Sequence, residues 1–457
     1  MDETRVNMNV TTIATVAEKI AGSGAPVGGI SQTEVLRQIA HHASTGVSRG
    51  EIAARSDLST ATVSKAVAHL IGLDLVDDDA QGRRRPGAEL GWTSHYVQVG
   101  VMISARGGHA TDLIGTVTKL DGTPLPSFMA PRKAGAWEDW ARQPITDTTY
   151  KAVRDQLCDF VRALIRRAEA DAPNAEVLGC GVSVGGHVDK GVLHKSFNTG
   201  WDEDVDLQVD LAAMLKSIGL GLDVVLENDV TSYAIHSNLT SRPAEDYALI
   251  AVQRDGVGGG IVVNGITRRG YHGLVAEIGH IYVGGAVSAS SDSPPLFRGN
   301  GPVCACGNVG CLQAFATPKA IFETARGTTD FKERDFEELA SQPYADTKVK
   351  NAFRQAGTAL GRGLASLIYL FDPKLVRLYL PPALLIDNEF LAGYAYMEAA
   401  REELMRYAYI GDSIDLGSLL ESKARSEDGL KELGAKAAAT TVLGQLILRV
   451  REQSRTR

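Results

Sequence analysis

Three of the five cysteines in the 457-residue chain fall within one short stretch, Cys304-Ala-Cys306-Gly-Asn-Val-Gly-Cys311. Thiolates at this spacing, with glycines between them, suit one tetrahedral metal ion better than a hydrophobic core. Gly307 and Gly310 allow the chain to turn back so that three sulfur atoms point to one centre. His280, in Glu277-Ile-Gly-His280, supplies a nitrogen that would complete a closed Cys3His site for structural zinc. The alternatives are free cysteines in a glycine-rich loop or an internal disulfide.

The composition is that of an ordinary globular protein, with 44% hydrophobic and 22% charged residues. The formal net charge of −8 provides no overall attraction to nucleic acid, so DNA binding requires a local basic patch. No segment approaches the roughly 20 apolar residues of a membrane span, and the first residues do not resemble a secretory signal. Only Cys158 and Cys180 lie outside the cysteine cluster, which is typical of a reducing compartment. We therefore expect a cytoplasmic protein of two or three domains.

The N-terminal part of the chain divides into a tail and a small helical domain. Residues 1–30 show no sustained periodicity and end in a glycine-rich stretch, so we expect a flexible tail. Three short helices follow, and the capping boxes Ser31-Gln-Thr-Glu34 and Ser48-Arg-Gly-Glu51 open the first two. Ser59 opens the third. The second and third helices are typical of a helix-turn-helix, and we expect it to be part of a winged domain over residues 31–95.

The third predicted helix carries the candidate DNA-reading surface. Val63, Val67 and Leu70 recur at helical spacing and must face the interior. Small hydroxyls and a lysine on the exposed first turns of a helix are what a reader of the major groove presents. The candidate DNA-binding residues are therefore Thr60, Thr62, Ser64 and Lys65.

A run of three arginines, Arg83, Arg84 and Arg85, lies between two short apolar segments after the helix-turn-helix. This position favours the wing of a winged helix, whose arginines would neutralise phosphates or enter the minor groove. The alternative for any arginine run is a solvated loop. Aspartates nearby weaken the local positive field, so we expect DNA affinity to depend on dimerisation.

Beyond the winged domain the periodicity indicates an α/β fold. Apolar strands are predicted at Val97–Ile103, Val177–Gly186 and Val224–Asp229, with an amphipathic helix at Lys151–Glu169. The last two strands end in glycines or polar residues, and the site of such a fold is expected at the strand ends. A glycine-rich turn at residues 255–260 is a weak phosphate-binding signal because it lacks a lysine or threonine.

Four motifs occur in an order that resembles the ROK family of repressors, open reading frames and kinases. They are Glu227-Asn228-Asp229, Gly256-Val-Gly-Gly-Gly260, Glu277-Ile-Gly-His280 and the cysteine cluster. With a winged helix in front, the chain resembles regulators of the NagC/XylR type. The resemblance implies an actin-like, two-lobed ATPase-type fold, operator DNA and a sugar-like effector as partners, and a homodimer or homotetramer. It places lobe 1 at residues 96–228, completed by the helix 430–457, and lobe 2 with the zinc site at residues 229–429.

The resemblance also implies a set of effector-binding residues. They are Asn198, Asn228, Asp229, Glu277, His280 and Gln313. Asp229 matches the general base of the family's kinases, a role that requires an acceptor at hydrogen-bond distance from a sugar hydroxyl. Gln313 stands where members of the family usually carry glutamate, and its amide can still hydrogen-bond a hydroxyl.

The positions implied for ATP binding depart from the family pattern. Met102 stands where the kinases carry aspartate, Arg254-Asp255 replaces a glycine and a threonine, and Leu380-Pro381-Pro382 replaces a glycine-rich adenosine loop. A general base without a positioned phosphate has nothing to activate, so Asp229 would be a relic and we expect a repressor without enzymatic activity. The alternatives are a sugar kinase with an added DNA-binding module, and a winged-helix protein whose larger part is only a dimerisation scaffold.

Overall fold

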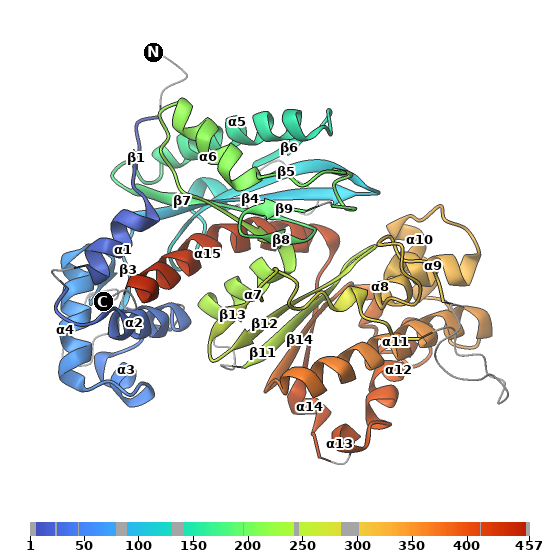
Figure 1. Cartoon of the computed structure of the whole chain (residues 1–457). Helices are drawn as coiled ribbons and strands as arrows, with labels where there is room; N and C mark the ends of the chain where they lie inside the picture. The colour runs from blue at the N-terminus through green and yellow to red at the C-terminus, as the bar shows by residue number, and fades with distance from the viewer. Residues whose placement is uncertain are drawn as a thin grey trace. The chain divides into compact units, whose positions relative to one another are not determined.

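The chain forms two compact units (Figure 1). The computed structural model describes residues 6–22, 25–43, 45–78, 89–129, 141–194, 196–241, 246–284, 301–411 and 413–453. The first unit contains Met1–Pro243 and Lys431–Arg457, and the second contains Ala244–Leu430. Helix α7 (Asp229–Thr240) belongs entirely to the first unit. The expected boundary between lobes lies before this helix, whereas the two compact units divide after it.

The sheet of the first unit is built around two long buried strands. Strand β4 (Tyr96–Arg106) pairs antiparallel with β5 (His109–Lys119) and parallel with β7 (Glu176–Val184). Strand β6 (Ala141–Pro144) extends the sheet beyond β5, and β10 (Val224–Asn228) pairs parallel with β7 on the other side. The carboxyl ends of β7 and β10 therefore lie side by side, with Asn228 opposite Val184.

Helices cover both faces of this sheet (Figure 1). Helices α5 (Tyr150–Glu169) and α6 (Leu207–Ser217) lie on one face, and α15 (Glu427–Gln453) crosses the opposite face. Two glycines allow the close approach of α15. A Cβ added to Gly181 would lie 1.7 Å from the Ala438 carbonyl oxygen, and one added to Gly100 would lie 2.1 Å from that of Ala435.

The prediction of a flexible tail is wrong for residues 9–21. Strand β1 (Asn9–Val10) pairs parallel with β7, and helix α1 (Ile13–Ala21) follows it, capped by the Thr12 side chain. The Ile13 N–H donates to Asp223 Oδ2 at 2.8 Å, just before β10 begins. The segment orders because the apolar face of α1 is buried, through Ile13, Val16, Ala17, Ile20 and Ala21.

The winged domain follows the predicted order of elements. Helix α2 (Gly29–His41) precedes the helix-turn-helix formed by α3 (Arg49–Arg55) and α4 (Thr60–Gly72). Strands β2 (Val76–Asp77) and β3 (Gly91–Trp92) then pair antiparallel and form the base of the wing.

Two of the three predicted helix starts are confirmed. Ser48 and Glu51 form a capping box at α3, and the Ser59 side chain accepts from the Thr62 N–H at the start of α4. Ser31 does not open a helix, because α2 already begins at Gly29 and Ser31 lies within its first turn.

The winged domain and the sheet domain of the first unit share one hydrophobic core. Buried residues of α1, α2 and α4 pack in the same cluster as residues of α7 and α15. From the larger domain this cluster includes Leu178, Val225, Ile235, Leu239, Leu443 and Leu446. A further link is a hydrogen bond of 2.9 Å between His69 Nε2 of α4 and the Lys19 carbonyl oxygen of α1.

The second unit has its own five-stranded sheet and core. The strand order is β13 (Ile266–Arg268), β12 (Val257–Val263), β11 (Tyr247–Val252), β14 (Leu375–Leu380) and β15 (Leu420–Ala424). Its core includes the long helix α11 (Thr347–Phe371), which packs against α12 (Tyr394–Met405). Of the predicted metal ligands, His280 is the last residue of η2 (Ile278–His280). The three cysteines lie in the segment that leads to α8 (Gln313–Ala316).

The remaining elements are short. In the first unit they are η1 (Pro126–Phe128), β8 (Val188–Asp189) and β9 (Val192–Leu193). In the second unit they are α9 (Pro318–Arg326), α10 (Glu333–Ala340), η3 (Pro382–Leu384), α13 (Ala408–Gly411) and α14 (Leu416–Leu419). Among the described residues, no helix is both long enough and apolar enough to cross a membrane.

Candidate metal centre, effector residues and DNA-binding surface

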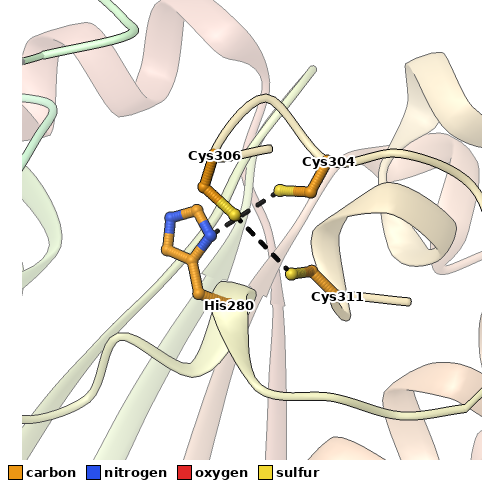
Figure 2. A group of neighbouring side chains, drawn as sticks. All are labelled: His280, Cys304, Cys306 and Cys311. Atoms are coloured by element: carbon orange, nitrogen blue, oxygen red, sulfur yellow. Dashed lines mark hydrogen bonds between the residues drawn. The ribbon is translucent and has the colours of Figure 1, made fainter. Parts of the chain in front are cut away.

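The four predicted metal ligands lie together in the second unit (Figure 2). Their ligand atoms are all within 4.8 Å of one another. His280 Nδ1 lies 3.7 Å from Cys304 Sγ, and Cys306 Sγ lies 3.8 Å from Cys311 Sγ. All three cysteines are free thiols in this structure.

These separations fit a tetrahedral zinc ion. Bonds of about 2.3 Å to sulfur and about 2.0 Å to nitrogen place neighbouring ligands of a tetrahedron about 3.5–3.8 Å apart. The separations of 3.7 Å from His280 to Cys304 and 3.8 Å from Cys306 to Cys311 agree with that range. Three thiols and one imidazole are also the donor set of a closed structural site, which leaves no open position for water.

Glycines shape the loop that presents the cysteines, as the sequence predicts. Gly307 and Gly310 have φ angles of +88° and +81°, a region that favours glycine. The turn is held by backbone hydrogen bonds from Cys304 N–H to the Asn308 carbonyl and from Gly307 N–H to the Cys304 carbonyl. The loop is thus ordered by its own backbone, with the sulfur atoms directed inward (Figure 2).

The protonation of the thiols is set by burial and by hydrogen bonds. Burial raises the pKa of Cys304, and burial with the neighbouring cysteines raises the pKa of Cys311 to about 12. Burial alone would also raise the pKa of Cys306, but hydrogen bonds from Asn308 and the other thiols bring this pKa below its usual value. An ion would have to displace protons from these thiols, so its affinity must depend on pH.

Glu277 lies near the Nε2 atom of His280. Its Oε2 is 4.0 Å from His280 Nε2, while the Nδ1 atom faces the cysteines. If Nδ1 bound a metal, Nε2 would carry the ring hydrogen toward this carboxylate, an arrangement that orients ligating histidines. Gly279, within η2, packs closely against β12, since an added Cβ would lie 2.1 Å from the Val257 carbonyl oxygen.

Three of the expected effector residues meet in the first unit at the ends of β7 and β10. Asn228 caps α7, with its Oδ1 accepting from the N–H groups of Val230 and Thr231 at 2.9 and 3.0 Å. Its Nδ2 donates to the Gly186 carbonyl at 2.9 Å. Asp229 is buried in the first turn of α7, where the helix dipole favours a carboxylate. Asn198 is exposed and lies over the adjacent Gly185, whose added Cβ would be 2.8 Å from Asn198 Nδ2.

The other three expected effector residues, Glu277, His280 and Gln313, meet in the second unit at the cysteine cluster. Gln313 opens the short helix α8 and directs its side chain to the metal ligands, with Nε2 donating to Cys304 Sγ at 3.1 Å. The sequence pointed to Gln313 only as a substituted sugar contact. Its contact with the Cys304 sulfur joins residues nine positions apart, and helix or strand periodicity cannot predict such a contact.

The residues expected at the ATP positions make contacts of their own. Met102 is buried near the end of β4 and packs against α15, because a Cβ added to Gly434 would lie 2.1 Å from Met102 Sδ. In the second unit, Arg254 lies 3.8 Å from the Asp255 carboxylate and stacks over the Phe331 ring at 5.4 Å. Leu380 is buried at the end of β14.

The predicted DNA-reading face of α4 has the expected orientation. Val63, Val67 and Leu70 are buried. Thr60 and Lys65 are exposed, and Thr62 and Ser64 are half-buried. The predicted wing arginines Arg83, Arg84 and Arg85 lie outside the described residues, between the paired strands β2 and β3.

Together these elements define a class of protein: a winged helix-turn-helix joined to an actin-like α/β domain that carries a Cys3His cluster. The ROK family profile matches residues 136–379, which is more than half of the chain, and the MarR family profile matches residues 29–85. The chain therefore belongs to the ROK family, and it carries a MarR-type winged helix at its N-terminal side.

Individual relatives include both repressors and kinases. The chain is 23% identical over 394 residues to a xylose repressor of Bacillus spizizenii, covering 85% of this chain and 90% of the repressor. It is 28% identical over 248 residues to a glucokinase of Thermotoga maritima, covering 50% of this chain and 72% of the kinase. The match to the repressor is the longer of the two and covers more of both chains.

Solved structures confirm the predicted fold class. A ROK family transcriptional regulator, a homologue of the E. coli MLC protein, has a TM-score of 0.64 at 19% identity and covers 93% of this chain and 100% of its own. A ROK hexokinase from Thermus thermophilus has a TM-score of 0.53 at 24% identity and covers 76% of this chain and 99% of its own.

Proposed function

We propose that the protein is a DNA-binding transcriptional repressor whose ROK domain binds a sugar-like effector and carries a structural zinc ion. The observation that carries this proposal is the hydrophobic core shared by the winged helix and the ROK part of the first unit. A shared core makes the position of the DNA-reading helix depend on the state of the larger domain. The xylose repressor relatives, which match over most of their length, support the same function.

Helix α7 provides the proposed connection between effector and DNA. It begins at Asn228 and Asp229, two of the expected effector residues. Further along, Ile235 and Leu239 pack in the shared core with α2, and α2 contacts α7 directly. An effector can relieve repression only if it binds one conformation more tightly than the other, and α7 offers such a conformation a route to the winged helix.

The expected effector-binding residues form two groups, one in each unit. Amide and carboxylate groups that are fixed by the backbone are suited to hydrogen-bonding sugar hydroxyls. The first unit carries Asn198, Asn228 and Asp229, and the second unit carries Glu277, His280 and Gln313. The xylose repressors and glucokinases among the relatives make D-xylose and D-glucose the first candidates to test.

Cys304, Cys306, Cys311 and His280 would hold the proposed zinc ion. When bound, the ion would supply a rigid tetrahedral link between two chain segments and no catalytic chemistry, because the donor set is complete. Two of the expected effector residues lie next to these ligands: Glu277 beside His280, and Gln313 beside Cys304. The ion would therefore hold the expected effector residues of the second unit in place.

We propose that the protein does not transfer phosphate. Phosphate positions in such enzymes need open space and donors directed at the anion. Met102 instead places an apolar side chain against α15, and the Asp255 carboxylate beside Arg254 would repel a phosphate. Incubation with ATP, magnesium and a sugar panel tests this view, and turnover at about 1–100 per second would favour the kinase alternative.

The direct test of the proposed function measures DNA binding with and without a sugar. Purified full-length protein, operator fragments from flanking promoters and a sugar panel that includes D-xylose and D-glucose are the components. We expect one sugar to change operator affinity by about 5–150-fold, and to raise the melting temperature with its concentration. Specific DNA binding with no response to any sugar in either assay would favour the scaffold alternative.

The arginines of the wing are expected to increase DNA affinity by contacting phosphates of the DNA backbone. In the Arg84→Ala/Arg85→Ala variant we expect roughly tenfold weaker DNA binding at low salt, and a salt dependence whose logarithmic slope is smaller by about 2, because two phosphate contacts are lost. Fluorescence anisotropy at several salt concentrations measures both quantities. The Lys348→Ala/Arg401→Ala variant removes two exposed cations from the second unit and should bind as the wild type does. An unchanged slope in the wing variant would remove the wing from the DNA interface.

We also propose a homodimer or homotetramer in the cytoplasm. A helix-turn-helix protein gains affinity and specificity by binding two half-sites about one helical turn apart. The acidic net charge and the aspartates at the wing leave a single copy with a weak field for DNA. Arg49 of α3 lies 3.4 Å from Asp78, which lowers the free positive charge of the winged domain further.

A further inference from the structure

Gln313 connects the two segments that carry the metal ligands. Its Nε2 donates to Cys304 Sγ at 3.1 Å. Its Oε1 lies against Gly279, where an added Cβ would be 2.9 Å from this oxygen. Gly279 immediately precedes His280, so one half-buried side chain lies against both the cysteine loop and the histidine turn.

The charge of the proposed site explains why a donor is useful there. A zinc ion with three thiolates and a neutral imidazole carries one net negative charge, which resides mainly on the sulfur atoms. N–H groups directed at these sulfurs offset that charge and fix the sulfur positions. The Cys306 backbone N–H is hydrogen-bonded to Cys304, and the Asn308 N–H to Cys306, so Gln313 adds a side-chain donor to a set of backbone donors.

We propose that Gln313 is a positioning residue of the metal site, whose amide N–H holds the Cys304 thiolate in place and offsets its charge. This inference rests on the proposed zinc site. It assigns Gln313 a different partner from the sugar hydroxyl implied by family resemblance, because the N–H is directed at sulfur. Gln313 would then act on the effector only indirectly, by ordering the expected effector residues of the second unit.

The identity of the residue fits this role. Glutamate has nearly the same shape as glutamine but, when ionised, has no hydrogen to donate. A carboxylate 3.1 Å from the Cys304 sulfur would repel the thiolate. The amide of Gln313 is therefore matched to the sulfur atom beside it.

The test compares zinc release from four forms of the full-length protein. Gln313→Glu removes the donor and adds charge, and Gln313→Ala removes the side chain. Gln156→Glu is the matched control, because Gln156 Nε2 donates at 2.8 Å to the Pro144 carbonyl, in the first unit and away from the cysteines. With a chromophoric chelator in excess, we expect both Gln313 variants to release zinc about 10–100-fold faster than the wild type and the control.

Cobalt substitution supplies a readout that a packing role would not change. Loss of the N–H contact makes the thiolate a stronger electron donor, so the sulfur-to-cobalt charge-transfer band should move to longer wavelength in both Gln313 variants. Wild-type release rates and an unshifted band in both variants would overturn the role of Gln313 while leaving the zinc site intact. Wild-type protein that holds no zinc would overturn the zinc site itself, and the inference with it.

Discussion

Replacing Cys306 with serine is expected to remove zinc from the protein. Structural zinc sites are built from thiolate, imidazole and carboxylate ligands, and a neutral serine hydroxyl is a poor substitute. The remaining ligands, Cys304, Cys311 and His280, would leave an open position and a weaker site. Elemental analysis of purified full-length protein should show a fall from about one zinc per chain to a small fraction of one.

The loss of zinc should also lower the stability of the second unit. An ion present at about 100 times its dissociation constant stabilises the folded state by about 2.7 kcal/mol. For a unit the size of Ala244–Leu430 this corresponds to a melting temperature lower by about 5–10 °C. A strong chelator should produce the same shift in the wild type and no further shift in the Cys306→Ser variant. Calorimetry measures both shifts.

Cys158 offers the matched control for this experiment. It is a buried free cysteine in the core of the first unit, outside the metal cluster. The Cys158→Ser variant places a hydroxyl in an apolar core and is expected to lose stability, but its zinc content should equal that of the wild type. Full zinc content in Cys306→Ser, or an equal loss of zinc in Cys158→Ser, would show that the cluster is not the metal site.

The cysteine cluster could be predicted from sequence because its geometry is mostly local. Three of the four ligands lie within eight residues, and the two glycines at positive φ are the residues that such a turn requires. Only His280 is distant, 24 positions before Cys304. Helices with a clear apolar face, such as α5 and α11, were predictable for the same reason, since 3.6-residue periodicity is visible in one segment alone.

The order at the N-terminal end was missed because its signals are short or distant. Strand β1 has two residues, too few to show alternation, and its partner β7 begins more than 160 residues later. Helix α1 does carry a signal: Ile13, Val16, Ala17 and Ile20 follow helical spacing after the capping residue Thr12. The glycine-rich stretch after it led to the prediction of a flexible tail.

The shared core was also beyond prediction. Apolar residues of α2 and α4 are equally consistent with a small domain that folds on its own and with a domain that packs on a larger one. The structure decides between these arrangements, because Leu36 and Val67 of the winged domain fall in one cluster with Leu239 and Leu446. The consequence is functional, since a tethered DNA-binding domain would not respond to its neighbour in the same way.

Two structural routes join β10 to the winged domain, one from each end of the strand. One is α7, which begins at Asn228 and reaches the shared core through Ile235 and Leu239. The other is α1, whose first N–H is held by Asp223 at the start of β10. Since both routes start from the strand that presents the expected effector residues, a change there would be felt at α2 and α4.

Shortening Leu239 to alanine is expected to weaken the effect of a sugar on DNA binding. The leucine is buried against α15, where a Cβ added to Gly444 would lie 3.8 Å from Leu239 Cδ1, and it belongs to the shared core. Its loss should lower the free energy of unfolding by about 2–5 kcal/mol. It should also reduce the coupling free energy between sugar and operator by about 0.5–2 kcal/mol, measured as the ratio of DNA dissociation constants with and without the sugar.

Leu164→Ala separates coupling from stability. Leu164 is buried in the core beneath α5, which belongs to a different cluster from the winged helix, so the variant should lose a similar amount of stability. Its response to the sugar should remain that of the wild type. An unchanged response in Leu239→Ala, or an equal loss in the two variants at matched folded fractions, would exclude α7 as the connection. A loss confined to Leu239→Ala would show that the shared core carries the signal, because the two variants differ only in which core they disturb.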